Sequence, residues 1–304
     1  MDKIASIIIT TYNRADLLEK RSLRSALKQV AGVEYYQIKP DDYEIIVVGD
    51  HCTDNTHEVM QRYPSVKFYN FTENKGLSCA RNFGIKQAVG KYVVCLDDDN
   101  ELMPKFLSKT LSEIGDADAL GVGRIVQYKE YADYASPIRM GQKKLSPFTS
   151  IDWGWLIKRE CFDTIQYDED LRANEDADFG IRFLKQFKAK MLNQPLTIAY
   201  DEFGDPKKSL SFPNARELDG MQKFYNKNRK EYEGHPEEMW HLYKLMGRKF
   251  YRGGHRLRGI RYFGQGLIRY PKFRSFLHFF FILFGWTVYD FYMSLEERVA
   301  HKLR

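Results

Sequence analysis

The first 115 residues alternate between short apolar runs and stretches with helical signals, and this alternation constrains the fold more than any other feature of the chain. Runs rich in β-branched or aromatic residues are typical of strands buried on both faces of a sheet. Four such runs cover residues 4–11, 44–48, 66–70 and 92–96. Helical spacing or capping signals follow them, over residues 17–30, after 56, over 78–89 and over 104–114. The pattern predicts an open, mostly parallel α/β sheet with flanking helices, which binds ligands beyond the carboxyl ends of its strands.

Three consecutive carboxylates, Asp97–Asp99, directly follow the fourth apolar run. Like charges at the end of a buried strand repel one another and are costly to desolvate, so packing does not account for them. A divalent cation with a bound diphosphate would need such oxygen ligands, whereas a solvated acidic turn is the structural alternative. Tyr12–Arg14 and Asp50 follow the first and second runs and would meet the triplet at one edge of the sheet. This convergence favours the ligand-binding interpretation.

The rest of the chain carries weaker signals. No GxxxxGK[ST] motif occurs and no GxGxxG follows the first run, which argues against a P-loop and a dinucleotide-binding fold. Strands are expected over residues 122–128 and 155–158, and an amphipathic helix after residues 171–180. Residues 205–214 are rich in helix breakers and are interpreted as a link. We therefore predict two domains, residues 1–215 and 216–304.

Cysteine usage and the first residues favour a cytoplasmic protein. Met1 to Ile4 lead straight into a strand-like run, without the pattern of a signal peptide. The four cysteines lack the spacing of a zinc site or a disulfide framework, which favours a reducing compartment. They are Cys52, Cys79, Cys95 and Cys161.

The C-terminal part is basic and aromatic. Residues 239–289 hold ten Lys and Arg and no acid, which leaves a charge of −4 on the rest of a chain whose net charge is +6. Residues 275–289 carry no formal charge, but as a helix they would extend only about 22 Å, less than the roughly 30 Å of a bilayer core. We predict a helical segment that lies on an anionic membrane surface. A helical subdomain packed on the catalytic domain is the alternative, and no nucleic-acid-binding module accompanies the charges.

Five stretches in order along the chain are Ser6–Arg14, Glu44–Thr56, Asn74–Lys86, Asp97–Asp99 and Asn174–Asp178. Together they resemble the motifs of one family, the inverting GT-A glycosyltransferases of family 2. They look like its opening strand and nucleotide loop, its second strand and acidic turn, its diphosphate-side helix entry, its DxD motif and its late acidic motif. The resemblance spans about residues 4–190 and implies a GT-A fold and a nucleotide-diphosphate sugar as donor.

The sequence departs from the family pattern at three points. The second-strand turn has Gly49 where the family usually has a first acid, so only Asp50 remains there. The processive QxxRW motif does not follow the late acidic motif, which argues against a synthase that retains its product. The histidine that is a third metal ligand in some relatives is also missing, and leaves Asp201, Asp205 or water for that position.

The resemblance implies the residues of a donor site. Asp99 would bind Mn²⁺ or Mg²⁺, with Asp97 or Asp98 near the ribose or in the second coordination shell. The nucleoside pocket would contain Thr10, Tyr12, Arg14 and Asp50, with Tyr12 against the base and Asp50 accepting the imide N–H of uracil. Lys75 and Arg81 would face the diphosphate. The structural alternatives are a helix cap for one of the acids, a half-buried aromatic for Tyr12 and solvated positions for the two cations.

The late acidic motif supplies the predicted general base. The resemblance places the base at Asp176, with Glu175 as its neighbour or an acceptor ligand. A second carboxylate nearby raises the pKa of a carboxylate, which suits a group that must accept a proton. A helix cap with an acidic first turn is the alternative for this motif. Trp153 is predicted to stack on the acceptor sugar, whereas Trp155 is assigned to the core.

These observations predict an inverting, metal-dependent, non-processive glycosyltransferase that takes a sugar from a UDP-linked donor. A glycan or lipid-linked saccharide would accept it at the inner face of the cell membrane, in cell-surface polysaccharide synthesis. Two other interpretations stay open. A nucleotidyltransferase that forms sugar nucleotides would need a glycine-rich phosphate loop, which residues 11–14 lack. A binding subunit without activity would fit Gly49 but not the intact acidic motifs.

Overall fold

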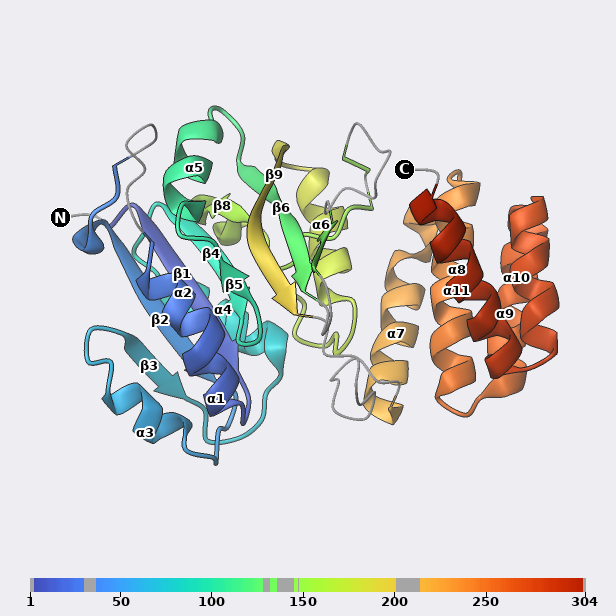
Figure 1. The fold of residues 1–304 in the computed structure, drawn as a ribbon, viewed down its shortest axis with the longest axis horizontal. Coiled ribbons are helices and arrows are strands. Elements are labelled where there is room, and N and C mark those ends of the chain that lie inside the picture. The colour runs from blue at the N-terminus through green and yellow to red at the C-terminus, as the bar shows by residue number, and fades with distance from the viewer. Residues whose placement is uncertain are drawn as a thin grey trace. The chain divides into compact units, whose positions relative to one another are not determined.

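The computed structural model describes residues 3–29, 37–127, 132–135, 145–146, 148–200 and 214–302. The chain divides into two compact units (Figure 1). The first contains Met1–Asp170 and Glu175–Asp205, and the second contains Leu171–Asn174 and Pro206–Arg304. The proposed division into domains 1–215 and 216–304 stays a prediction.

The first unit is built on a nine-stranded sheet of order β3-β2-β1-β4-β8-β6-β9-β5, with β7 paired to β6. Strands β3, β2, β1 and β4 form a parallel half (Figure 1). Their bounds are β1 (Ala5–Thr11), β2 (Tyr43–Gly49), β3 (Lys67–Asn70) and β4 (Tyr92–Asp97). These are the four strands expected from the apolar runs, and the predicted open α/β sheet with flanking helices is confirmed.

Two hydrophobic clusters explain why the parallel half consists of continuous apolar runs. Every residue of β1 and β2 is buried, and successive side chains enter opposite clusters, Ile7 and Ile9 on one face and Ile8 on the other. The first cluster is covered by the π-helical turn η1 (Leu18–Leu23), which directly follows α1 (Ala15–Leu17), and by α2 (Arg24–Leu27) and α5 (Phe106–Glu113). The second is covered by α4 (Leu77–Gln87) and α6 (Glu175–Leu184). The short helices η2 (Pro40–Asp42), α3 (Thr56–Gln61) and η3 (Arg159–Asp163) lie in connections.

The other half of the sheet is mixed. Strand β6 (Ala119–Gln127) is parallel to β9 (Ala189–Tyr200) and antiparallel to β8 (Leu156–Lys158) and β7 (Ala132–Ala135). Strand β5 (Glu101–Leu102) is antiparallel to β9. The expected strands at 122–128 and 155–158 correspond to β6 and β8, whereas β7 and β9 were not expected from the sequence.

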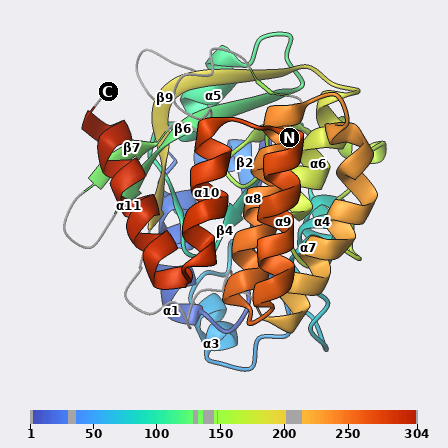
Figure 2. The same ribbon diagram turned by 90° about the vertical axis from the view of Figure 1, so that its right-hand side faces the viewer.

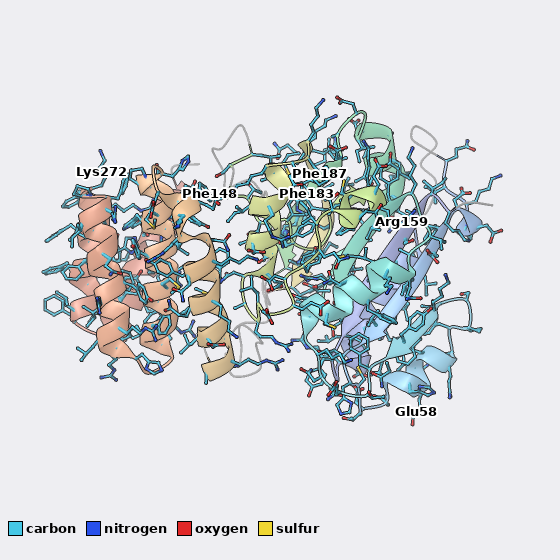
Figure 3. The ribbon with its side chains drawn as sticks, turned by 180° about the vertical axis from the view of Figure 1, so that it is seen from behind. Glu58, Phe148, Arg159, Phe183, Phe187 and Lys272 are labelled. Carbon is cyan, nitrogen blue, oxygen red and sulfur yellow. The ribbon has the colours of Figure 1, made fainter. Side chains whose placement is uncertain are left out.

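Helix α6 is held on the sheet by aromatic packing. Phe179 and Phe183 are fully buried, and Phe187, just beyond the helix, packs against Phe183 with tilted rings whose centroids are 5.0 Å apart (Figure 3). Phe179 also stacks on Tyr167 with centroids 4.4 Å apart. This packing fixes the amino-terminal end of α6, where the late acidic motif begins.

The second unit is helical (Figure 2). Glycines allow α8 (Pro236–Arg252) and α9 (Arg256–Arg269) to approach closely, since a Cβ at Gly259 would lie 2.8 Å from the carbonyl oxygen of Gly247. No described helix combines the length and the hydropathy that a membrane-spanning segment needs. The helices are α7 (Ala215–Asn228), the short η5 (Arg229–Tyr232), α8 (Pro236–Arg252), α9 (Arg256–Arg269), α10 (Phe273–Leu283) and α11 (Trp286–Lys302).

Candidate active site

The loops after β1 and β2 meet at the carboxyl edge of the parallel half. Asn13 and His51, which follow these strands, have left-handed backbones with φ of 52° and 67°. Such conformations are uncommon for residues other than glycine and tend to occur at functional sites. The side chain of Asn13 accepts a hydrogen bond from the backbone amide of Thr53 at 2.7 Å, which ties the two loops together. Asn174, directly before α6, is also left-handed, with φ of 56°.

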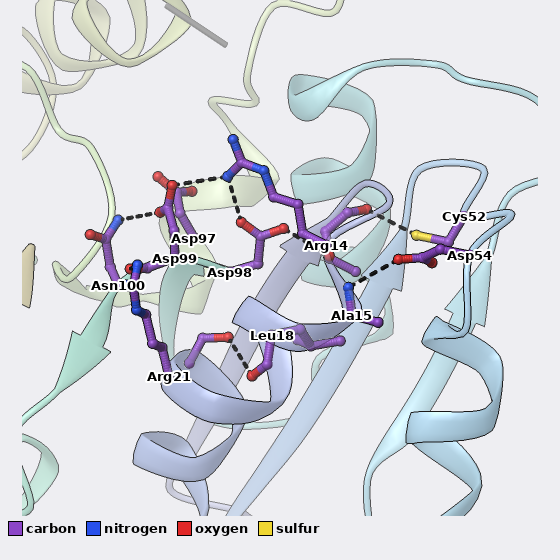
Figure 4. A network of polar contacts seen from close by, with 12 residues as sticks. Arg14, Ala15, Leu18, Arg21, Cys52, Asp54, Asp97, Asp98, Asp99 and Asn100 are labelled. Carbon is purple, nitrogen blue, oxygen red and sulfur yellow. Dashed lines mark hydrogen bonds and ion pairs between the residues drawn. The ribbon is translucent and has the colours of Figure 1, made fainter. Parts of the chain in front are cut away.

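The acidic triplet lies at this edge and is partly neutralised by Arg14 (Figure 4). Asp98 is buried, and its carboxylate accepts hydrogen bonds from the Thr11 hydroxyl at 2.8 Å and from Arg14 Nη1 at 3.0 Å. The same nitrogen of Arg14 donates to Asp99 at 2.9 Å. Burial raises the pKa of Asp98 to about 6, although Arg14 and Thr11 oppose this shift. Burial, followed by the charge of Asp97, also raises the pKa of Asp99.

Asp97 and Asp99 are suited to a divalent cation that is also bound by a diphosphate. Their side chains lie beside each other, and the charge of Asp97 disfavours ionisation of Asp99 (Figure 4). A hard cation would relieve this repulsion, and Mg²⁺ is commonly held by one or two carboxylates together with phosphate oxygens and water. Among the described residues, no group of three His, Cys, Asp or Glu side chains is placed to hold a metal. Asp201 and Asp205, two candidates for a third ligand, lie outside the described residues.

The predicted nucleoside residues occupy different environments at the same edge. Thr10 is buried at the end of β1, whereas the ring of Tyr12 is 41% exposed. The carboxylate of Asp50 accepts hydrogen bonds from the backbone amides of Lys75 and Gly76, at 2.6 and 2.8 Å. Asp50 therefore holds the loop that leads into α4, a role that the sequence did not indicate.

Asn70 explains why a glycine is present where the family pattern has an acid. A Cβ at Gly49 would lie 2.6 Å from the Asn70 side-chain oxygen. That oxygen accepts from the amide of Cys52 at 2.8 Å, and the Asn70 side-chain nitrogen donates to the Cys52 carbonyl at 3.0 Å. The Asn70 amide thus occupies the space that a side chain at position 49 would need.

Arg81 lies between the acidic triplet and the late acidic motif. Its side chain is only 3% exposed. Nη2 donates to the Asp97 carboxylate at 2.8 Å, and Nη1 donates to the Glu175 carboxylate at 3.1 Å. The structure therefore brings the two motifs together through an arginine that lies 94 residues before Glu175 and that was predicted to face a diphosphate.

Asp176 has the properties of a proton acceptor near neutral pH. It is half-buried in the first turn of α6, and its carboxylate accepts from the Ala177 amide at 2.8 Å. Burial and the charges of Glu175 and Asp152 raise the pKa of Asp176 to about 7, whereas Arg81 opposes the shift. Asp178, in contrast, is buried and paired with Arg182 at 2.8 Å, which is a structural role.

The region around Trp153 contains a pair that the sequence analysis missed. Trp153 is 6% exposed and belongs to a core cluster, and its predicted stacking on an acceptor sugar stays a prediction. The guanidinium of Arg124 lies 4.5 Å from its ring centroid and pairs with the Asp152 carboxylate at 2.9 Å. Asp152 in turn affects the pKa of Asp176. No motif marks Arg124 or Asp152, so only the fold reveals them.

Known proteins resemble this chain in sequence. Residues 6–185 match the family model described as glycosyl transferase family 2. The uncharacterized glycosyltransferase EpsJ of Bacillus subtilis is 28% identical over 221 residues, which is 65% of this chain and 61% of EpsJ. The GalNAc(5)-diNAcBac-PP-undecaprenol beta-1,3-glucosyltransferase of Campylobacter jejuni is 32% identical over 130 residues, 41% of this chain and 39% of that enzyme. The chain thus spans less than two thirds of either relative.

The fold is shared with a solved structure. The S. aureus protein TarS, residues 1–349, in complex with UDP-GlcNAc, superposes with a TM-score of 0.54 at 16% identity, over 89% of this chain and 73% of that one. At this identity the likeness establishes the GT-A fold alone. Because the family model covers more than half of the sequence, this chain belongs to glycosyl transferase family 2.

Proposed function

We propose that the protein is an inverting, metal-dependent, non-processive glycosyltransferase that moves one sugar from a UDP-sugar to a glycan or lipid-linked acceptor. The observation that carries this proposal is that Arg81 binds both Asp97, on the donor side, and Glu175. Glu175 directly precedes Asp176, whose pKa is raised to about 7. The comparisons support the substrate classes, since the similar TarS structure is a complex with UDP-GlcNAc and the Campylobacter jejuni enzyme is named for glucosyl transfer to an undecaprenol-linked saccharide. The chain is also 28% identical over 199 residues to the minor teichoic acid biosynthesis protein GgaB of Bacillus subtilis. This similarity supports a role in the synthesis of cell-surface polysaccharides.

In the proposed reaction, the acceptor hydroxyl oxygen attacks the anomeric carbon while the Asp176 carboxylate takes its proton. The bond from that carbon to the diphosphate oxygen breaks, and the electron pair leaves with the diphosphate. Because attack comes from the face opposite the leaving group, the anomeric configuration inverts. A base with a pKa near the working pH suits this transfer, because a substantial fraction is ionised and that fraction is basic enough to accept the proton.

On the donor side, Asp99 would hold Mn²⁺ or Mg²⁺, with Asp97 or Asp98 near the ribose or in the second coordination shell. The cation would neutralise charge on the diphosphate as it leaves. Tyr12, whose ring is exposed, would lie against the base. Asp50 would accept the imide N–H of uracil, and Lys75 would face the diphosphate. Thr10, Arg14 and Asp98 complete the proposed pocket.

Release of UDP from UDP-sugars, with and without a saccharide acceptor, tests this function. We expect activity that declines below about pH 7, because protonated Asp176 cannot act as base. Asp176→Asn should lower kcat by about 10²–10⁴-fold. Asp163→Asn, which changes an exposed acid elsewhere in the same unit, is the control and should be active. Binding of the donor without any turnover would contradict the proposal and favour a binding subunit.

We also propose that the second unit holds the enzyme on the anionic inner face of the cell membrane. Phe276 and Phe280 of α10 stack with ring centroids 5.9 Å apart, and Phe284, just beyond the helix, packs against Phe280 at 4.9 Å. All three are exposed. Phe273 at the start of α10 is 76% exposed and is flanked by Lys272 and Arg274. Exposed aromatic rings beside cations are typical of helices that lie in a membrane interface.

Flotation with liposomes tests this surface. The full chain should float with vesicles containing anionic lipid and not with neutral ones. Phe276→Ser combined with Phe280→Ser should weaken this association without loss of UDP binding. Association that is unaffected by these substitutions and by lipid charge would contradict the membrane proposal alone.

A further inference from the structure

We propose that Arg81 is a positioning residue for sugar transfer, which sets the place of the late acidic motif relative to the acidic triplet. This inference rests on the proposed function, in which Asp176 is the base. One guanidinium is shared by two carboxylates, Asp97 at the end of β4 and Glu175 at the start of α6, at 2.8 and 3.1 Å. Asp97 stands two residues before the proposed metal ligand, and Glu175 directly precedes the proposed base.

The geometry requires an arginine. Two different nitrogens of the planar guanidinium meet the two carboxylates, whereas the ammonium of a lysine is a single point charge on a flexible stem. The side chain is almost completely buried, so each of these hydrogen bonds is charge-assisted in a medium of low dielectric. Breaking a buried ion pair of this kind is costly, because it leaves an uncompensated buried charge.

An aromatic ring packs against the guanidinium of Arg81. The guanidinium carbon lies 5.2 Å from the ring centroid of Tyr167, which itself stacks on Phe179 of α6 at 4.4 Å. Helix α6 therefore contacts the Arg81 bridge twice, through Glu175 and through the Phe179–Tyr167 stack. Any shift of the bridge would move the first turn of α6, and with it Asp176.

This arrangement differs from a direct role in diphosphate binding. The guanidinium is 3% exposed and already bound to two carboxylates, so it presents almost no surface to a ligand. Its effect on the reaction would come through the position of Asp176. A misplacement of about 1 Å at a reacting group can lower a rate by about 10²-fold.

Separate measurements of donor binding and turnover test the inference. We would determine the Kd of UDP with Mn²⁺ by calorimetry and kcat with saturating UDP-sugar, for Arg81→Lys, Glu175→Gln and the double variant. We expect Arg81→Lys to lower kcat by about 10²-fold and to change the Kd of UDP by less than about threefold. Because the two residues would act as one unit, the double variant should lose little more than Arg81→Lys alone.

Arg159→Lys is the control, since Arg159 is an exposed arginine of the same unit that donates from Nε to the carbonyl oxygen of Gly90 (Figure 3). It should retain wild-type kcat. A rise of about tenfold or more in the Kd of UDP with unchanged kcat for Arg81→Lys would identify a diphosphate ligand and overturn the inference. Unchanged kcat and Kd would also overturn it. If Arg81→Lys fails to fold, the same comparison of kcat and the Kd of UDP is made between Glu175→Gln and the wild type. A wild-type protein without transfer activity would contradict the proposed function instead.

Discussion

Nη1 of Arg14 lies 2.9 Å from Oδ2 of Asp99, the carboxylate that we propose as the metal ligand. The guanidinium also donates to Asp98 (Figure 4). Arg14 thus supplies positive charge to the same carboxylates that would bind a divalent cation, and the two cations must compete.

Removal of this competitor should strengthen metal binding in the absence of nucleotide. We expect Arg14→Ala to bind Mn²⁺ alone about fivefold more tightly than the wild type, a gain of about 1 kcal/mol. Calorimetric titration with MnCl₂ measures this effect. Arg24→Ala, at an exposed position on α2, is the control. Equal or weaker Mn²⁺ binding by Arg14→Ala would show that the guanidinium does not oppose the cation.

Asp176 should lower the stability of the folded protein at neutral pH. Its pKa is about 7 in the folded protein and about 3.9 when unfolded, so the folded state binds more protons between these values. Stability is therefore lost as pH rises through this window. We expect Asp176→Asn to raise the free energy of unfolding by on the order of 1 kcal/mol at pH 8 and to have little effect at pH 4. Urea unfolding at pH 8 and pH 4 measures the difference in the free energy of unfolding between the wild type and Asp176→Asn. A rise in this free energy at pH 4 alone would contradict the assigned direction of the pKa shift.

The Gly49–Asn70 contact predicts a coupled pair. Gly49→Asp should lower the free energy of unfolding by about 1–3 kcal/mol, because its Cβ would overlap the Asn70 side chain. Asn70→Ala alone should also lower the free energy of unfolding, since two hydrogen bonds to Cys52 are lost. In the double variant the clash is absent, so its loss should be smaller than the sum of the two single losses. Strictly additive losses in urea unfolding would refute the coupling.

The close crossing of α8 and α9 can be tested with two glycines of the same helix. An Ala Cβ at Gly259 would meet backbone and side-chain atoms of α8 at 2.8 Å, whereas at Gly264 the nearest atom is 3.4 Å away. Gly259→Ala should therefore lower the free energy of unfolding by about 1–3 kcal/mol. Gly264→Ala should be neutral or stabilising by up to about 1 kcal/mol, because alanine favours a helix. Similar thermal midpoints for both variants would contradict the crossing geometry.

The parallel half of the sheet could be predicted because its strands are buried on both faces and each must be continuously apolar. Strand β9 lacks that signal. Residues 190–195 within it include Lys190, Asn193, Gln194 and Pro195, and its register with β6 shifts near Pro195. Proline inside a run normally argues against a strand, so a half-exposed strand with an irregular register has no clear pattern in the sequence.

Site residues could be predicted where acidic side chains lie at the carboxyl end of a strand, as Asp50 and Asp97–Asp99 do. The partners of these residues could not, because pairings such as Arg81 with Glu175 or Arg124 with Asp152 depend on tertiary structure. Single residues without a motif give no sign of what they will contact once the chain folds. The location of the acidic motifs and the presence of Arg14 and Arg81 at the site could therefore be inferred, but not which carboxylates these two arginines bind.

Calorimetric binding of UDP, with and without Mn²⁺, tests the central claim most directly. We expect the wild type to bind UDP in a metal-dependent manner and Asp99→Asn to lose the dependence on metal together with most of the affinity. UDP binding that is equal with and without Mn²⁺, or unchanged in Asp99→Asn, would contradict the proposed donor site. Failure to bind UDP at all would contradict the proposed glycosyl donor.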